Sequence, residues 1–218
     1  MNTHLYRLSG RRLLRLLIAA VILLSVSVPG VQASLHASGK TYLELDTVVT
    51  GAPPVLEYFS FYCPACYGYD NELKVTERMK SALPEGTRLT QYHAHFMGPL
   101  GDELTRAWSV AILMNIEDKM KPLLFEAVQI KQSVHSWTDI RQVFTDAGVQ
   151  GAEFDAAWES FGVLSMTEMQ NKLAQELKLT GIPAVYINGK YQINPAGMNA
   201  SSVEAFVNDY IDEVRYLL

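Results

Sequence analysis

The chain has 218 residues, of which 49% are hydrophobic and 19% are charged, with 18 basic and 23 acidic side chains. A net charge of −5 leaves no basic excess to hold phosphates, so nucleic acid is not an expected partner. The length and the ordinary composition suffice for one domain with a buried core, or for one domain that carries an insertion.

Residues 1–33 have the pattern of a secretory signal peptide. Four arginines between positions 7 and 15 precede an apolar run at 16–28, and small residues follow at Val31 and Ala33. We expect cleavage between Ala33 and Ser34, which leaves 14 basic and 23 acidic residues, a net charge of −9, and an oxidising destination. The run is shorter than the roughly 20 residues of a spanning helix, so an uncleaved anchor is the less favoured alternative. Arg11-Arg12 also fits a twin-arginine signal.

The next segments predict strand, strand, helix and strand. Residues 41–46 alternate weakly and indicate an edge strand, whereas 55–59 form an apolar run typical of a strand covered on both faces. A helix is expected from the CPAC segment, residues 63–66, to about residue 80. Residues 88–96 then predict another strand.

Only helical patterns follow, from about residue 98 to residue 161. Pro122 is expected to open the second of these helices, as proline does at a first helical position. Ser165 and Glu168 form a capping box at the start of a long helix. Asn188-Gly189 then predicts the turn of a β-hairpin.

These elements predict an α/β fold interrupted by an all-helical domain. We expect residues 34–97 and 165–218 to form the two parts of the α/β domain, and 98–164 to form the helical insertion. The two flanking parts are expected to pack together.

The only two cysteines of the chain, Cys63 and Cys66, stand three positions apart. A disulfide stabilises a fold by closing a long loop, so a pair this close is expected to do chemistry. Pro64 suits a helix start and makes Cys63 the N-cap, where free N–H groups and the helix dipole favour a thiolate. We expect Cys63 to be the exposed nucleophile with a lowered pKa. Cys66, one turn further on, is expected to resolve the mixed disulfide.

A zinc site is the rival interpretation of the two cysteines. His93 and His95 lie on a predicted strand with both imidazoles on one face, and two Cys plus two His would complete a tetrahedral site. The proline inside the CxxC segment restricts the loop of such a site, and thiols in an oxidising compartment tend to pair. We therefore expect no metal and no cofactor beyond a redox-active Cys63–Cys66 disulfide.

Two further positions are candidates for the site. Glu57 lies within the apolar strand that leads to Cys63, where it could accept the proton of Cys66 during exchange, or it could simply point outward. Ile182-Pro183 precedes the hairpin strand, and its free backbone could pair with an extended substrate if it faces the CPAC turn. As a bare signal, a trans peptide is the default for this dipeptide.

Four long motifs occur in an order that resembles the DsbA family of periplasmic thiol:disulfide oxidases. They are VLEYFSFYCPACY, HFMGPLGDELTRAW, EFDAAWESF and GIPAVYINGKYQINPAGM, and the resemblance runs from about residue 51 to the C-terminus. It implies a thioredoxin-like fold with a helical insertion, catalysis by Cys63 and Cys66, a cis Pro183 beside the disulfide, and a buried Glu57 that relays protons. It also implies periplasmic localisation, reduced secreted proteins as substrates, and a membrane quinone reductase of the DsbB type as the reoxidising partner.

The chain departs from the DsbA pattern at two positions. DsbA carries Cys-Pro-His-Cys, whereas residue 65 is alanine, so Ala65 is expected to give a less depressed Cys63 pKa. The lysine that pairs with the buried glutamate falls at Gln91, so Glu57 is expected to lack its charge partner. A specialised paralogue is therefore as plausible as a general oxidase.

The main alternatives are a disulfide isomerase or reductase, and a non-enzymatic peptide- or zinc-binding module. An isomerase usually needs a dimerisation segment, and none is evident, so we expect a monomer.

Overall fold

The computed structural model describes residues 36–218, and the expected signal peptide with its cleavage site lies outside them. A five-stranded mixed sheet has the strand order β1-β5-β4-β2-β3. Its strands are β1 (Tyr42–Glu44), β2 (Val55–Phe59), β3 (Leu89–His93), β4 (Ala184–Ile187) and β5 (Tyr191–Ile193). Only β2 and β3 are parallel, and the other neighbours are antiparallel. The expected edge strand, buried strand and hairpin are thus confirmed.

The helix after the CPAC segment is broken into three pieces. They are α2 (Pro64–Tyr67), the π-helical turn η1 (Gly68–Glu72) and α3 (Val75–Ala82). The break falls at Lys74, which has a φ of 56° in the left-handed region. The prediction of a single continuous helix from the CPAC segment to about residue 80 is therefore wrong.

Between β3 and β4 the described chain is helical. The elements are α4 (Gly101–Leu113), α5 (Glu117–Phe125), the π-helical turn η2 (Glu126–Ile130), α6 (Trp137–Asp146), α7 (Gly151–Trp158) and α8 (Phe161–Glu176). A short 3₁₀ turn, η3 (Pro195–Gly197), and the C-terminal helix α9 (Val203–Leu217) follow the hairpin. None of the helices between residues 36 and 218 is both long and apolar enough to cross a membrane.

Two expected helix starts are wrong. Pro122 lies inside α5, which begins at Glu117 because the Ile116 carbonyl already accepts hydrogen bonds from the first turn. The Ser160 hydroxyl caps α8 by accepting from the Val163 N–H at 3.2 Å, five residues before the predicted capping box. Ser165 therefore lies within the helix, which crosses the predicted boundary at residue 165.

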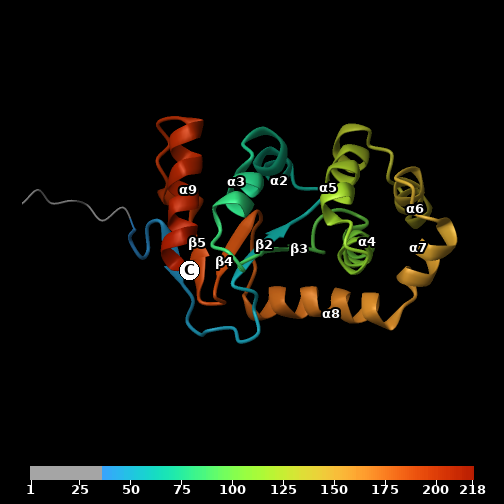
Figure 1. The fold of residues 1–218 in the computed structure, drawn as a ribbon, viewed down its shortest axis with the longest axis horizontal. Helices are drawn as coiled ribbons and strands as arrows, with labels where there is room; N and C mark the ends of the chain where they lie inside the picture. Colours follow the sequence, from blue (N-terminus) through green and yellow to red (C-terminus); the bar gives the residue numbers. More distant parts are fainter. Residues whose placement is uncertain (1–35) are drawn as a thin grey trace, which may run out of the picture. The chain divides into compact units, whose positions relative to one another are not determined.

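The sheet is covered by α3 and α9 on one face and by α8 on the other (Figure 1), and alternation along β2 sends neighbouring side chains to opposite faces. Val55 packs with residues of α3 and α9 on one face. Leu56 and Tyr58 pack with Leu173 of α8 on the other. All five residues of β2 are buried, so Glu57 lies on the covered face beneath α3. The last residue, Phe59, belongs to a third cluster that includes both cysteines and the core of the insertion.

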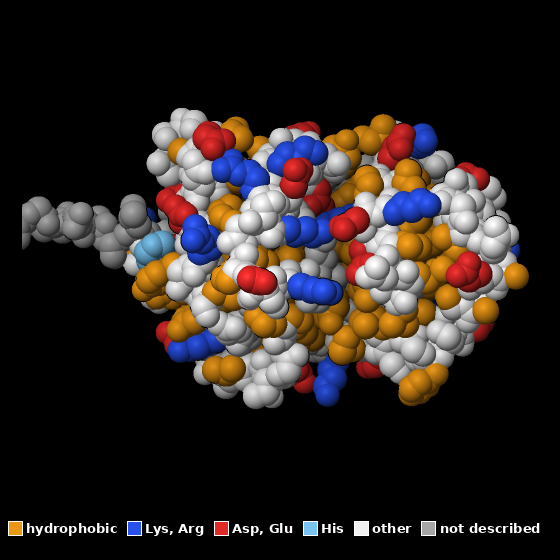
Figure 2. All heavy atoms as spheres, in the orientation of Figure 1, with side chains coloured by type: hydrophobic (Ala, Val, Ile, Leu, Met, Phe, Trp, Pro, Cys, Tyr) orange, Lys and Arg blue, Asp and Glu red, His pale blue; other side chains and the backbone are white. Residues whose placement is uncertain are grey.

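On the face of the molecule in Figure 2, acidic and basic side chains are interspersed, and neither sign forms a continuous patch.

Candidate active site

The CPAC segment lies where β2 ends and α2 begins. Cys63 is the N-cap residue with extended backbone angles, φ −88° and ψ 111°, and Pro64 occupies the first turn. The Cys63 Sγ accepts a hydrogen bond from the Cys66 backbone N–H at 3.2 Å. The helix register predicted from the proline is confirmed, because this bond satisfies one of the free N–H groups of the first turn.

Both cysteines are free thiols and both are buried, with exposed fractions of 4% for Cys63 and 1% for Cys66. The expectation that Cys63 is exposed is therefore wrong. Its side chain folds over the start of α2 and faces the loop at Ile182, while the side chains beside it, Pro64 and Ala65, are exposed.

The two thiols have opposite pKa shifts. A hydrogen bond from the Cys66 thiol lowers the pKa of Cys63 to about 7, and the N–H groups of Cys66 and Ala65 add to it against the cost of burial. Burial raises the pKa of Cys66, and the neighbouring Cys63 raises it further. The lowered pKa agrees with the sequence analysis, although the largest cause is the second thiol rather than the helix N–H groups. Cys63 is thus the more readily ionised thiol of the pair, and Cys66 holds its proton more tightly.

The Ile182-Pro183 loop borders the cysteines. The peptide bond between Ile182 and Pro183 is cis, as the resemblance implied. The Cys63 Sγ lies 3.7 Å from the Ile182 carbonyl oxygen, to which the thiol donates. The antiparallel pairing of β2 with β4 ends at Tyr58 and Ala184, just beyond this loop. Backbone at Ile182 therefore lies beside the reactive sulfur and outside the sheet ladder.

Glu57 is buried, with 2% of its surface exposed, so the outward-pointing alternative is wrong. Its carboxylate accepts hydrogen bonds from the Gln91 amide and, at 3.5 Å, from the Thr76 hydroxyl. Burial raises the pKa of Glu57, and the ammonium of Lys121 partly opposes that effect. The charge of Glu57 in turn raises the pKa of Cys66.

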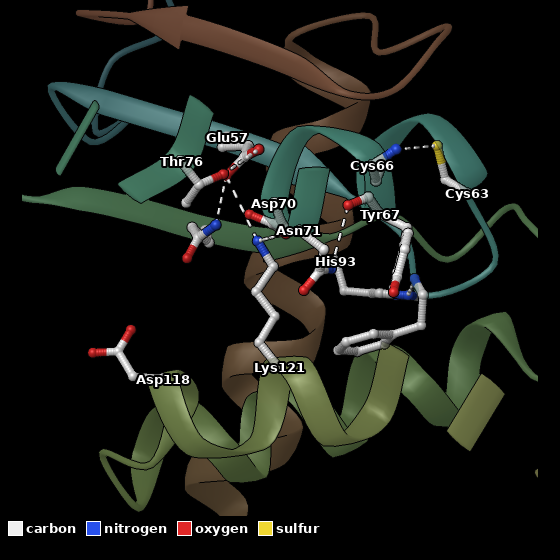
Figure 3. A network of polar contacts seen from close by, with 12 residues as sticks. Glu57, Cys63, Cys66, Tyr67, Asp70, Asn71, Thr76, His93, Asp118 and Lys121 are labelled. Carbon is white, nitrogen blue, oxygen red and sulfur yellow. Dashed lines mark hydrogen bonds and ion pairs between the residues drawn. The ribbon is translucent and has the colours of Figure 1, made fainter. Parts of the chain in front are cut away.

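The expectation that Glu57 lacks a charge partner is also wrong. Gln91 is neutral, but Lys121 of α5 places its Nζ 3.8 Å from Glu57 Oε2 and 2.5 Å from Asp70 Oδ2 (Figure 3). No motif in the sequence signals this contact, because Lys121 and Glu57 are 64 positions apart and belong to different layers.

His93 and His95 are not arranged for zinc. The buried His93 ring accepts from the Phe61 N–H through Nε2 at 3.1 Å and contacts the Thr105 hydroxyl through Nδ1 at 2.8 Å. Burial lowers the pKa of His93 to about 3, so this ring is a neutral structural group. His95 lies beyond the strand and pairs with Asp102 at 3.1 Å. Within residues 36–218, no three His, Cys, Asp or Glu side chains are grouped to hold a metal ion.

A glutamine that the sequence analysis missed fixes the loop before the cysteines. The Gln129 amide of η2 donates to the carbonyl oxygens of Phe61 at 2.9 Å and Cys63 at 3.0 Å. The insertion thus holds the backbone of the CPAC turn directly. A single glutamine in a helical segment carries no sequence signal for such a role.

A buried Cys-x-x-Cys pair with one activated thiol, set at a helix start beside a cis-proline loop, defines a thiol:disulfide oxidoreductase. The model of the DSBA-like thioredoxin domain matches residues 54–211. The chain belongs to this family, and its fold is thioredoxin-like with a helical insertion.

The chain is similar in sequence to named thiol:disulfide interchange proteins. The thiol:disulfide interchange protein DsbA of Salmonella typhimurium is 54% identical over 186 residues, which are 85% of this chain and 90% of the relative. DsbA of Escherichia coli K12 is 48% identical, with 85% and 89% covered.

The fold is also similar to solved structures of this family. A Proteus mirabilis DsbA variant with the non-covalently bound peptide PWATCDS is 42% identical, with a TM-score of 0.81 over 83% of this chain and 97% of that one. SrgA of Salmonella enterica serovar Typhimurium is 39% identical, with a TM-score of 0.78 over 81% and 98%.

Proposed function

We propose that this oxidoreductase acts as a dithiol oxidase, which donates its Cys63–Cys66 disulfide to reduced, unfolded secreted proteins. The observation that carries the proposal is the capped Cys63 sulfur. The hydrogen bonds to this sulfur stabilise the reduced form and have no equivalent when the sulfur is in a disulfide. A protein whose reduced form is favoured in this way gives up its disulfide readily.

Donation proceeds in two exchange steps. A substrate thiolate attacks Cys63 Sγ, a bond forms between these sulfurs, and Cys66 leaves with the electron pair and gains a proton. A second substrate thiolate then attacks the substrate sulfur of the mixed disulfide, which closes the substrate disulfide and releases Cys63 as the thiolate. Two substrate thiols are oxidised and the enzyme disulfide is reduced to a dithiol.

Glu57 is proposed to exchange the Cys66 proton in these steps. Its buried carboxyl acts on Cys66 electrostatically, and burial raises its pKa, which makes the carboxylate a better proton acceptor than that of an ordinary glutamate. Its hydrogen-bond partners are Thr76 and Gln91, so the transfer to Cys66 runs through an intervening water molecule.

The substrate is proposed to lie in an extended form against Ile182 and Pro183. The position of the Ile182 backbone beside Cys63 supports this, as does the peptide bound to the Proteus mirabilis relative. The signal-peptide pattern supports a periplasmic location, where a membrane quinone reductase of the DsbB type would return the dithiol to the disulfide. The chain is proposed to work as a monomer without a cofactor.

The test is oxidation of a reduced two-cysteine peptide by the oxidised protein. We expect stoichiometric oxidation by the wild type and none by Cys63→Ser. Cys66→Ser has no disulfide to donate, so it is mixed instead with the oxidised peptide. Its Cys63 thiolate should open the peptide disulfide, free one peptide thiol and accumulate as the mixed disulfide. Single turnovers that leave the peptide reduced, or a Cys63→Ser variant that traps the peptide, would contradict the assigned roles. Adding a DsbB-type reductase with quinone then tests the reoxidising partner, since turnover should become catalytic.

A further inference from the structure

A lysine of the helical insertion ends among the acidic side chains beneath the active site. Lys121 extends from α5 toward Asp70 and Glu57, with Nζ distances of 2.5 and 3.8 Å (Figure 3). The same Nζ lies 4.2 Å from the centroid of the Phe59 ring, and the residue is only 7% exposed. Lysine is almost never buried to this extent without a partner, so the two carboxylates compensate its charge.

The charges of this cluster do not balance when all groups are ionised. One ammonium faces two carboxyl groups, so the cluster becomes neutral only when one carboxyl holds a proton. Burial raises the pKa of Glu57, Asp70 raises it further, and Lys121 is the largest influence in the opposite direction. The lysine therefore opposes the effect of burial and favours release of the proton from Glu57.

Other titratable groups face Glu57 from the surrounding elements. Cys66 of α2, Tyr69 of η1 and Tyr210 of α9 each interact with its charge, and Lys80 of α3 weakly lowers its pKa. Lys80 is paired with Asp118 at 2.6 Å and is partly exposed. Lys121 is thus the principal cation of the site.

A cavity of about 300 Å³ lies between α3 and α5, beside this cluster. Its lining includes Asp70, Thr76, Gln91, Asp118 and Lys121. The volume is sufficient for several water molecules, which would find polar partners in Asp70, Thr76, Gln91 and Lys121. Water in this cavity would therefore reach Asp70 and Lys121 directly, while Glu57 lies behind its hydrogen-bond partners Thr76 and Gln91.

We propose that Lys121 is a positioning residue for disulfide exchange, which sets the charge state of the Glu57–Asp70 pair so that the Cys66 proton passes from Glu57 through this pair to water in the cavity beside α5. The inference rests on the relay role of Glu57 proposed above. Because Gln91 of the sheet is neutral, the insertion supplies the cation that the relay needs.

The experiment measures, as a function of pH, the rate at which Cys66 attacks a mixed disulfide at Cys63. Reduced protein is mixed with oxidised glutathione, and release of glutathione from the Cys63 mixed disulfide by Cys66 is followed from pH 4 to 9. We expect Lys121→Met to move the inflection of the pH–rate profile to higher pH by about one unit. At pH values below the inflections of both proteins, release of glutathione should then be about tenfold slower in the variant than in the wild type. Lys119→Met, the same change at an exposed position of α5, should leave the inflection in place.

A relocated cation separates electrostatics from packing. Lys121→Met/Gln91→Lys returns an ammonium to Glu57 from β3, and we expect the wild-type inflection to be restored. Should Lys121→Met fold poorly, Gln91→Lys alone must still move the inflection to lower pH, because it adds a second cation. An unmoved inflection in Lys121→Met, or a double variant that is not rescued, overturns the role of Lys121.

Glu57→Gln distinguishes the two proposals. If it removes the inflection while Lys121→Met leaves it unmoved, only the inference on Lys121 is wrong. If Glu57→Gln leaves the profile unchanged, the relay is wrong, and the role of Lys121 is overturned with it.

Discussion

The backbone N–H of Cys66 points at the Sγ of Cys63 across 3.2 Å, so each cysteine acts on the other through the helix that joins them. The Cys66 thiol adds a second hydrogen bond and is the largest cause of the lowered Cys63 pKa. Cys66 thus lowers the pKa of Cys63 through both its thiol and its backbone N–H.

The first prediction concerns ionisation of Cys63. We expect ultraviolet thiolate absorbance of the reduced protein to titrate with a pKa of about 7, below the ordinary value of 9.0. Cys66→Ala should raise this pKa, because it removes the thiol donor but keeps the backbone N–H. A Cys63 pKa near 9 in the wild type, or no change in Cys66→Ala, would contradict the assignment.

The second prediction concerns the residue between the cysteines. Ala65→His should lower the Cys63 pKa further and make the protein more oxidising, because an imidazole at this exposed position can donate to the thiolate. Thiolate titration and equilibration with glutathione measure the two effects. The matched control is Ala200→His, the same change at an exposed site outside the active site. Equal values in Ala65→His and wild type would show that position 65 does not face the sulfur.

The third prediction links redox state to stability and pH. The pKa of Cys63 is lower in the folded protein than its ordinary value of 9.0. The stability that its thiolate contributes to the reduced protein is therefore fully present above pH 9 and is lost as the pH falls through about 7. After allowance for solvent screening, we expect the free energy of unfolding of the reduced form to be about 1–2 kcal/mol larger than that of the oxidised form above pH 9. Denaturant unfolding of both forms at several pH values measures the difference. A stability difference between the two forms that grows as the pH falls would contradict this prediction.

The fourth prediction concerns Gln129. Gln129→Ala should lower the free energy of unfolding by about 1–3 kcal/mol, because two backbone carbonyls beside the CPAC turn lose their donor. We also expect slower reaction of oxidised protein with thiols, since the turn is less well held. Gln142→Ala, at an exposed position of α6 where the amide contacts Asp146, is the control and should change stability little. Comparable losses in both variants would argue against the bridging role.

Local patterns were enough to predict the strands, the hairpin and the N-cap position of Cys63. Such features depend on alternation, turn chemistry and the fixed φ of proline, which act over a few residues. The order of strand, helix and strand patterns also predicted a sheet domain interrupted by helices. The direction of the Cys63 pKa shift followed from the same local rules, since an N-cap faces the free N–H groups of its own helix, but its largest cause is the Cys66 thiol.

Contacts between distant segments were beyond the reach of these rules. The cation for Glu57 comes from α5, and the amide that holds the CPAC turn comes from η2, both inside the insertion. The burial of Cys63 likewise depends on the Ile182 loop, 119 positions away. Tertiary packing selects these partners because burying a charge or a carbonyl requires a compensating group within a few ångströms, whatever part of the chain provides it.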